Sequence, residues 1–190
     1  MKLMSLLCPR CREDLEGANN SRVFFCRSCA IGIDLSRERE REYPLQCIIP
    51  EIERRENTIY FAFWVFACRY NWISSTSDER GETRKDFWVP AFFIKNISYF
   101  GDIGLYYSNR DLKPRTGRCR NRKVFPADRG EAHASVYPRI YAFSREAERK
   151  RDIVEITTLT TRLAWVPFYI AGREYIDSLL GWAYPSGALI

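Results

Sequence analysis

Two cysteine pairs near the start of the chain have the residue type and spacing of a metal site. Cys8 and Cys11 form one Cys-x-x-Cys turn, Cys26 and Cys29 form a second, and fourteen residues separate the two. Such a turn presents two thiolates from one tight knuckle, and four thiolates complete the tetrahedral coordination of Zn²⁺. The sequence therefore predicts one zinc ion. Because four protein ligands close the coordination, its role would be structural rather than catalytic.

Two other chemistries could use the same cysteines. A rubredoxin-like iron centre has the same ligands, but its knuckles carry a glycine directly after the second cysteine, where this chain has Arg12 and Ala30. A redox-active disulfide is open to any Cys-x-x-Cys pair. Two pairs at this separation favour zinc over both alternatives.

The residues around the cysteines are expected to fold as a small hairpin. Polar residues 17–21 can form a turn, residues 23–25 suit a strand that runs into the second pair, and alternation over 31–35 suits a returning strand. Over residues 5–35 the sequence resembles the zinc-ribbon superfamily, which implies a local fold and a structural metal but no single function. The remainder resembles uncharacterised bacterial zinc-ribbon proteins, a likeness that implies no activity.

A segment of alternating charge divides the sequence. Residues 36–42 read Ser-Arg-Glu-Arg-Glu-Arg-Glu, which is typical of a solvated connection. We therefore expect a zinc ribbon at 1–36, a charged linker at 37–44 and an aromatic-rich β domain at 45–190. The predicted fold class is α+β, mostly β, in which the small N-terminal ribbon precedes an antiparallel β domain with one surface helix.

Aromatic residues dominate the second domain, since fifteen of the 28 in the chain lie between Tyr60 and Tyr107. Residues 58–70 are predicted to form a strand that is apolar on both faces, so both faces must be covered, by this chain or by a partner. We expect further strands at 87–94 and 157–170, with a polar loop at 74–85 and a turn-rich segment at 96–104. Residues 174–180 suit either a hairpin strand or a helical turn, and the strand is preferred.

Two Trp-Val-Pro segments, at 88–90 and 165–167, echo each other, which leaves open either a duplicated half-sheet or chance. A proline removes a donor from the sheet, so Pro90 and Pro167 are expected at edges or at strand starts. A helix is predicted from Ser144 as N-cap, with Glu146 in its first turn and basic residues later. Because few apolar residues lie on one side of this predicted helix, we expect it on the surface of the protein.

The net charge of +6 is concentrated in residues 110–123. The candidate contacts there to phosphates or to an acidic partner are Arg110, Lys113, Arg115, Arg118, Arg120, Arg122 and Lys123. The metal-loaded ribbon would be near neutral, which disfavours nucleic-acid binding through the ribbon itself. A solvated loop is the alternative to either kind of contact.

The remaining cysteines suggest no disulfide framework. Cys47 and Cys68 lie in apolar surroundings and are expected to be buried, whereas Cys119 between two arginines is either a reactive or an incidental loop thiol. An odd number of cysteines favours the reducing cytoplasm, and no apolar stretch is long enough to span a membrane.

Catalytic motifs are missing from the sequence. There is no phosphate loop, no nucleophile elbow and no dinucleotide fingerprint, and His133 is the single histidine. We predict a non-catalytic zinc-binding adaptor subunit of a larger complex that docks on other proteins through its aromatic β domain and its apolar end. The candidate docking residues are Trp182, Tyr184, Leu189 and Ile190. The alternative is a nucleic-acid-binding zinc-ribbon protein that uses residues 110–123.

Overall fold

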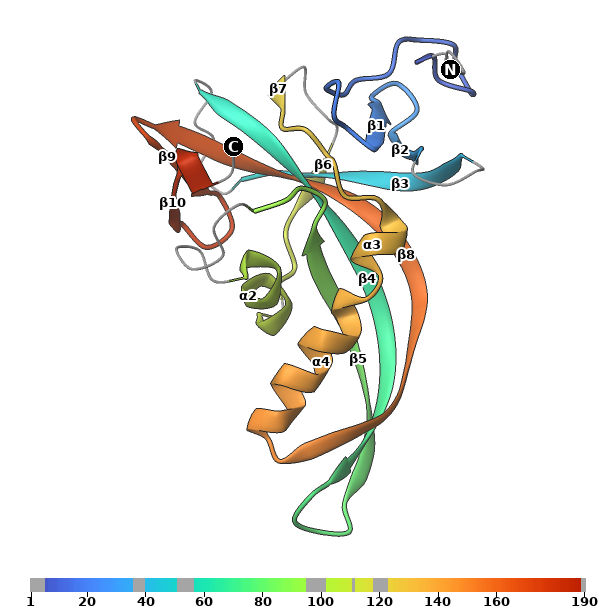
Figure 1. The fold of residues 1–190 in the computed structure, drawn as a ribbon, viewed down its shortest axis with the longest axis vertical. Helices are drawn as coiled ribbons and strands as arrows, with labels where there is room; N and C mark the ends of the chain where they lie inside the picture. Colours follow the sequence, from blue (N-terminus) through green and yellow to red (C-terminus); the bar gives the residue numbers. More distant parts are fainter. Residues whose placement is uncertain are drawn as a thin grey trace.

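The computed structural model describes residues 6–35, 40–50, 57–94, 102–110, 112–117 and 123–188. Within these residues one ten-stranded sheet has the central strand order β1-β2-β3-β8-β4-β5 (Figure 1). The strands are β1 Val23–Cys26, β2 Ile31–Asp34, β3 Arg41–Ile48, β4 Thr58–Ser74, β5 Arg80–Pro90, β6 Thr116–Gly117, β7 Lys123–Val124, β8 Arg151–Ala171, β9 Glu174–Asp177 and β10 Ala183–Pro185. The predicted mostly-β fold is confirmed. Most pairings are antiparallel, but β3 with β8 and β4 with β7 are parallel.

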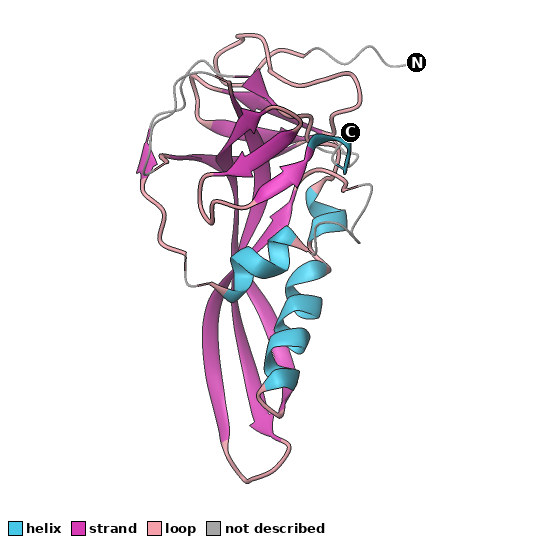
Figure 2. Ribbon diagram, turned by 90° about the vertical axis from the view of Figure 1, so that its left-hand side faces the viewer, coloured by secondary structure: helices cyan, strands magenta, loops and turns pink. Residues whose placement is uncertain are grey.

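Residues 6–35, with the two Cys-x-x-Cys turns and the β1–β2 hairpin, are called the ribbon here as a structural label. Three long strands extend together away from it as a curved arm (Figure 1). β8 pairs with β4 along its whole length, from Thr58 opposite Tyr169 to Ser74 opposite Arg151, and β5 pairs with β4 on the other side. Helix α4 (Tyr137–Glu148) runs along one face of this arm (Figures 1 and 2).

Strand β4 is buried on both faces over its first half, as its composition predicts. Tyr60, Trp64 and Phe66 belong to a core that includes ribbon residues and residues of α4. Phe61 and Phe63 belong to a second core with α2 and the C-terminal strands. The cover on both faces therefore comes from this chain itself.

The helices differ from the prediction. α2 (Ile103–Asn109) and α3 (Glu131–Ala134) were not expected, and α4 begins at Tyr137 rather than at Ser144. A proline in the first turn of α4 favours this earlier start, because its fixed φ suits that position and no donor is lost. The residues expected to continue the helix beyond 150 instead open strand β8.

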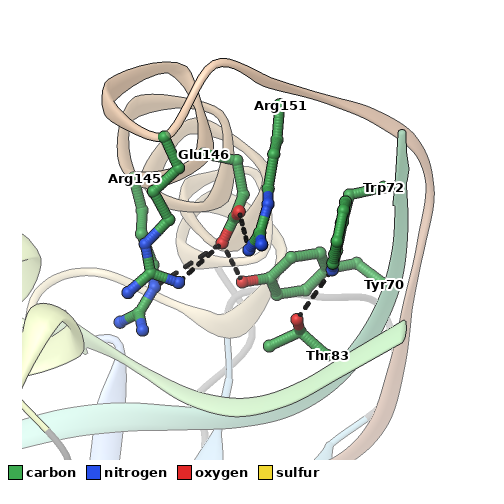
Figure 3. A network of polar contacts seen from close by, with 7 residues as sticks. Tyr70, Trp72, Thr83, Arg145, Glu146 and Arg151 are labelled. Carbon is green, nitrogen blue, oxygen red and sulfur yellow. Dashed lines mark hydrogen bonds and ion pairs between the residues drawn. The ribbon is translucent and has the colours of Figure 1, made fainter. Parts of the chain in front are cut away.

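A buried carboxylate fastens α4 to the arm (Figure 3). Glu146 is fully buried and accepts a hydrogen bond of 2.8 Å from the hydroxyl of Tyr70 on β4. Guanidinium groups lie 3.5–3.6 Å from its oxygens, and they belong to Arg145, Arg149 and Arg151. The guanidinium of Arg151 also lies 3.6 Å from the ring centroid of Trp72. The sequence predicted Glu146 in the first turn of a surface helix, and its burial appears only when the arm and helix are placed together.

The polar loop predicted at 74–85 is mostly strand, because β5 begins at Arg80 and pairs with β4 almost to the tip. The strand expected at 174–180 ends earlier, at Asp177. The buried carboxylate of Asp177 accepts hydrogen bonds from the backbone N–H groups of Leu179, Leu180 and Trp182, which turns the chain.

The two prolines lie in different settings. Pro90 lies at the end of β5, which is an edge strand, in keeping with the expected edge position. Pro167 lies inside β8, an interior strand, so the expected edge position is wrong. The partners of β8 change there, from β3 at residues 163–165 to β9 at residues 168–171. The missing N–H therefore falls at a junction between two neighbouring strands, where the sheet loses no ladder bond.

Strand β3 joins the ribbon to the main sheet. Its residues 41–44 pair with β2 and its residues 45–47 pair with β8, so 41–44 are strand residues where a linker was expected. The ribbon also packs closely on β8 at Gly32. A Cβ added there would lie 2.1 Å from a methyl carbon of Leu163, too close for a larger residue without movement. The ring of Phe25 meets Trp165 edge-on at 5.0 Å.

Candidate metal centre

Four cysteine thiols from two knuckles come together at the N-terminal end of the molecule. The sulfur atoms of Cys8, Cys11, Cys26 and Cys29 all lie within 4.8 Å of one another. The Cys8–Cys29 sulfur distance is 3.9 Å and the Cys11–Cys26 distance is 3.4 Å. Zn–S bonds of about 2.3 Å in a tetrahedron place sulfurs roughly 3.8 Å apart. The four thiols therefore lie close enough together to hold one metal ion.

Local backbone structure builds both knuckles. Cys26 is the last residue of β1, and β2 begins at Ile31, one residue beyond Ala30, which follows the second knuckle. In the first knuckle the N–H of Arg12 donates to the carbonyl of Cys8 at 2.9 Å. In the second, the N–H of Cys29 approaches the sulfur of Cys26 at 3.4 Å. An amide that points at sulfur stabilises a thiolate ligand.

The residue after each knuckle has a left-handed backbone. Arg12 has φ of 65° and Ala30 has φ of 50°. Glycine is favoured in this conformation because it has no Cβ to clash. In rubredoxin-like iron centres a glycine follows each knuckle. Here Arg12 and Ala30 adopt the left-handed conformation that glycine favours. The absence of glycine at these two positions is therefore weaker evidence against an iron site than the sequence alone suggested.

The four thiols influence one another's ionisation. Burial raises the pKa of Cys8, but backbone hydrogen bonds from Cys11 and Arg10 outweigh burial and hold it at about 7. Hydrogen bonding to Cys11, together with burial, raises the pKa of Cys29 to about 12. Four thiolates this close repel one another, and a divalent cation removes that penalty. The donor set therefore fits a metal ion that prefers sulfur.

The basic residues of the knuckles are paired with carboxylates. Arg10 forms an ion pair with Glu42 at 2.6 Å, and Arg27 forms one with Glu16 at 2.6 Å. The side chain of Ser28 donates to Glu13. These pairings fit a ribbon surface with little excess positive charge.

The basic segment 110–123 does not form one continuous surface in its described part. Arg110 and Lys113 line a cavity beside the arm, whereas Lys123 lies in β7 and lines another cavity next to the ribbon. Arg115 is exposed just before β6. Arg118, Arg120 and Arg122 lie outside the described residues, and so does Cys119.

The predicted docking residues at the end of the chain differ in exposure. Tyr184 is buried, with 3% of its surface exposed, and packs in the second core against Phe168. Trp182 is half-buried and its ring meets Tyr106 edge-on at 4.6 Å. Leu189 and Ile190 lie outside the described residues. Tyr184 thus contributes to the core rather than to an exposed surface, and the observation speaks against it as a docking contact.

Two other cysteines are described. Cys68 is buried, as expected. Cys47 is also buried but is disulfide-bonded, which the sequence did not predict. His133 is exposed and lies 5.4 Å from the ring of Phe93, so it has no role at the cysteine cluster.

Comparison with protein-family models, with curated proteins and with solved structures finds no match. Among the described residues, no helix has both the length and the apolar character to cross a membrane. The arrangement of four thiols that could hold a metal ion is therefore the functional feature that the structure itself supports.

Two groups of residues were missed at the sequence level. The outer face of α4 carries exposed apolar side chains, and a spacing of four and three residues from Val136 to Ile140 to Phe143 could have revealed it. Arg84 and Lys85 on β5 join Arg110 and Lys113 around one cavity. No local pattern could have shown that second grouping, because the residues come together only through the fold.

Proposed function

We propose that this protein is a non-catalytic, zinc-binding adaptor subunit. The zinc ion would be held by Cys8, Cys11, Cys26 and Cys29 and would stabilise the ribbon. The support is the set of four thiols within 4.8 Å of one another, since four protein ligands around one ion would leave no position for a substrate or a reactive water. Thiolate ligands favour zinc among the divalent ions available to proteins.

The outer face of α4 is the surface that carries the adaptor proposal. Val136, Ile140 and Phe143 are 53%, 55% and 41% exposed, although each is a large apolar side chain. Together with exposed Ala147 they follow one stripe along the helix, opposite the buried face formed by Tyr141 and its neighbours. A contiguous exposed apolar stripe marks an interaction surface more often than scattered apolar residues do.

The partner that fits this stripe is an amphipathic helix with acidic flanks. A ridge of side chains at helical spacing packs into the groove of another helix. Arg139 lies beside the stripe, and its guanidinium lies 5.6 Å from the ring centroid of Phe143. Residues 137–151 contain five basic and two acidic side chains, and three of the basic ones, Arg145, Arg149 and Arg151, pair with the buried Glu146. Electrostatic complementarity therefore favours an acidic partner.

The docking prediction is tested by polar substitution on α4. Cross-linking in the native cell identifies the partner, which is then purified and titrated against the protein. The double variant Ile140→Ser, Phe143→Ser is expected to lower affinity by about tenfold or more, because interface anchors of this size contribute most of the binding energy. Its own free energy of unfolding should change little, because both side chains are exposed.

The matched control is Ile73→Ser with Val154→Ser, which removes two apolar side chains that are 46% and 65% exposed near the tip of the arm. This control is expected to bind normally. Equal affinity for the α4 variant and the native protein would contradict the proposal. Concentration-dependent dimerisation that the α4 variant abolishes would also contradict it, since the stripe would then serve a second copy of the chain.

The described part of residues 110–123 divides its cations between two cavities. For that reason nucleic-acid binding is not proposed as the function.

A further inference from the structure

We propose that a cavity between the arm and the segment after α2 binds a phosphate-bearing small molecule of nucleotide size. The cavity has a volume of about 480 Å³ and lies where β5 passes the C-terminal end of α2. Four of its lining residues are basic, namely Arg84, Lys85, Arg110 and Lys113. This inference is independent of the adaptor proposal, because it uses neither α4 nor the cysteine cluster.

Basic side chains outnumber acidic ones among the described residues that line the cavity. Asp86 is the one acidic residue of that described lining, and its carboxylate already forms an ion pair of 2.5 Å with Arg162. Arg84 approaches Glu82 at 3.3 Å, but the two side chains are 70% and 45% exposed. Such an exposed pair contributes little and exchanges easily for a better acceptor. The lining thus offers several cationic donors to an anion.

The cations converge from separate parts of the chain. Arg84 and Lys85 lie on β5, whereas Arg110 and Lys113 follow α2, some 25 residues later. Arg84, Asp86 and Trp88 share one face of β5, the face toward α2, and all three line the cavity. Lys85 also lines the cavity but belongs to the alternate set of strand residues, so the argument for anion binding depends on Arg84, Arg110 and Lys113.

Apolar residues complete the wall and indicate the rest of the ligand. Ala67, Trp88, Leu112 and Leu159 also line the cavity. Pockets for small molecules combine an apolar lining with a few polar groups and have volumes of about 300–1,000 Å³. A phosphate attached to an apolar or planar body would place its charge at the basic residues and its body against the leucines. A nucleoside monophosphate has this chemistry.

The test is calorimetric titration of the full-length, zinc-loaded protein with three probes: adenosine 5′-monophosphate, inorganic phosphate and adenosine. We expect the monophosphate to bind at one site, inorganic phosphate to bind more weakly, and adenosine not to bind. The double variant Arg110→Ser, Lys113→Ser should lower the affinity for the monophosphate at least tenfold. Both side chains are exposed, so the variant should fold normally, which circular dichroism checks.

A control of equal charge change is Arg80→Ser with Arg173→Ser, at two exposed positions that do not line the cavity. This control should bind the monophosphate like the native protein. Absence of binding by both phosphate probes overturns the inference, and so does an equal loss in the control, which would indicate general attraction to positive charge. Binding of single-stranded oligonucleotides without binding of the monophosphate also overturns it, because the ligand would then be nucleic acid.

Discussion

Arg12 and Ala30 occupy a backbone conformation that suits neither residue. Both have φ in the left-handed region, directly after the second cysteine of a knuckle, and both are exposed. A residue with a Cβ is destabilised there by about 1–2 kcal/mol. The ribbon therefore stores strain at two symmetric positions, which a tightly bound metal ion can offset.

Replacing either residue with glycine is expected to stabilise the metal-loaded protein. Arg12→Gly and Ala30→Gly should each raise the free energy of unfolding by about 0.5–1 kcal/mol, since relief of strain exceeds the entropic cost of glycine. Chemical denaturation measures the change. Asn19→Gly, in a turn of the same ribbon without positive φ, is the control and should be destabilising. Destabilisation by all three substitutions would contradict the strain argument.

Tyr70 makes stability depend on pH in the alkaline range. Burial, and then its hydrogen bond to Glu146, raise the pKa of Tyr70 to about 12 from an ordinary value near 10. The folded state holds the phenolic proton more tightly than the unfolded state does. The stabilisation is therefore complete below pH 10 and is lost as pH rises toward 12.

The corresponding experiment compares the native protein with Tyr70→Phe across this range. The variant should be less stable at pH 7 by about 1 kcal/mol, because one hydrogen bond is lost. Between pH 10 and pH 12 its stability should fall less steeply, by the contribution of about one proton. Equal slopes for the two proteins, measured by urea unfolding at each pH, would show that Tyr70 does not link folding to protonation.

At the scale of elements, the packing of α4 against the arm involves a buried carboxylate, that of Glu146. Glu146 is fully buried among three guanidinium groups and the hydroxyl of Tyr70. Because the arginines come from α4 and from the start of β8, the carboxylate connects the end of the helix to the arm. Removing one member of a buried ionic cluster leaves the others uncompensated.

Glu146→Ala is expected to destabilise the protein by about 3–5 kcal/mol, the range for breaking a buried ion pair. Glu148→Ala, two residues later and exposed, should change stability by less than about 0.5 kcal/mol. Thermal unfolding of both variants distinguishes these outcomes. A Glu146→Ala protein as stable as Glu148→Ala would mean that the cluster is not what holds α4 against the arm.

The same elements show how far the sequence could predict the fold. The strand over 58–70 could be predicted because its residues form a continuous apolar run. Such a run is visible in the local sequence without knowledge of the fold. The start of α4 was misplaced because Ser144 and the charges after it imitate a helix N-terminus, while Pro138 and the buried face of the helix set the real one. Polar strand residues on the arm looked like loop, since their pairing partners lie far away in the sequence.

The cluster of four thiols was easier to predict than the cavity or the α4 stripe. Its four cysteines lie in two short motifs, so their spacing in the sequence was enough to predict that they come together. The cavity that Arg84 shares with Arg110 and the stripe on α4 depend instead on tertiary packing and on exposure. Residue type does not encode these properties without the fold.

At the scale of the whole molecule, the ribbon is not an isolated unit. Phe25 packs on Trp165, and β3 pairs with both the ribbon and β8. The buried carboxylate of Asp34 accepts a hydrogen bond of 2.6 Å from the N–H of Glu131. Loss of the ribbon would therefore expose apolar surface of the main core.

Metal removal is expected to destabilise residues far from the cysteines. Structural zinc contributes about 10–16 kcal/mol in small zinc domains, which is comparable to the whole stability of a typical protein. After chelation, hydrogen exchange should accelerate in β1 and β2 and also in residues 163–166 of β8. Continued protection of β8 while the ribbon exchanges freely would contradict this coupling.

The identity of the metal is checked by elemental analysis of protein purified without added metal. We expect one zinc ion per chain, and its loss when the four cysteines are replaced with serine. Cys68→Ser, which removes a buried thiol outside the cluster, is the control and should retain zinc. Stoichiometric iron, or zinc that remains in the four-serine variant, would contradict the assignment.

The position of β8 in the sheet also determines the order in which the protein can be made. β8 lies between β3 and β4 in space, although about a hundred residues separate it from them along the chain. A ribosome therefore releases the apolar strand β4 long before the strand that covers its flank has been synthesised. Until residue 171 has emerged, the nascent chain exposes an unpaired apolar edge, the state in which proteins aggregate and chaperones bind.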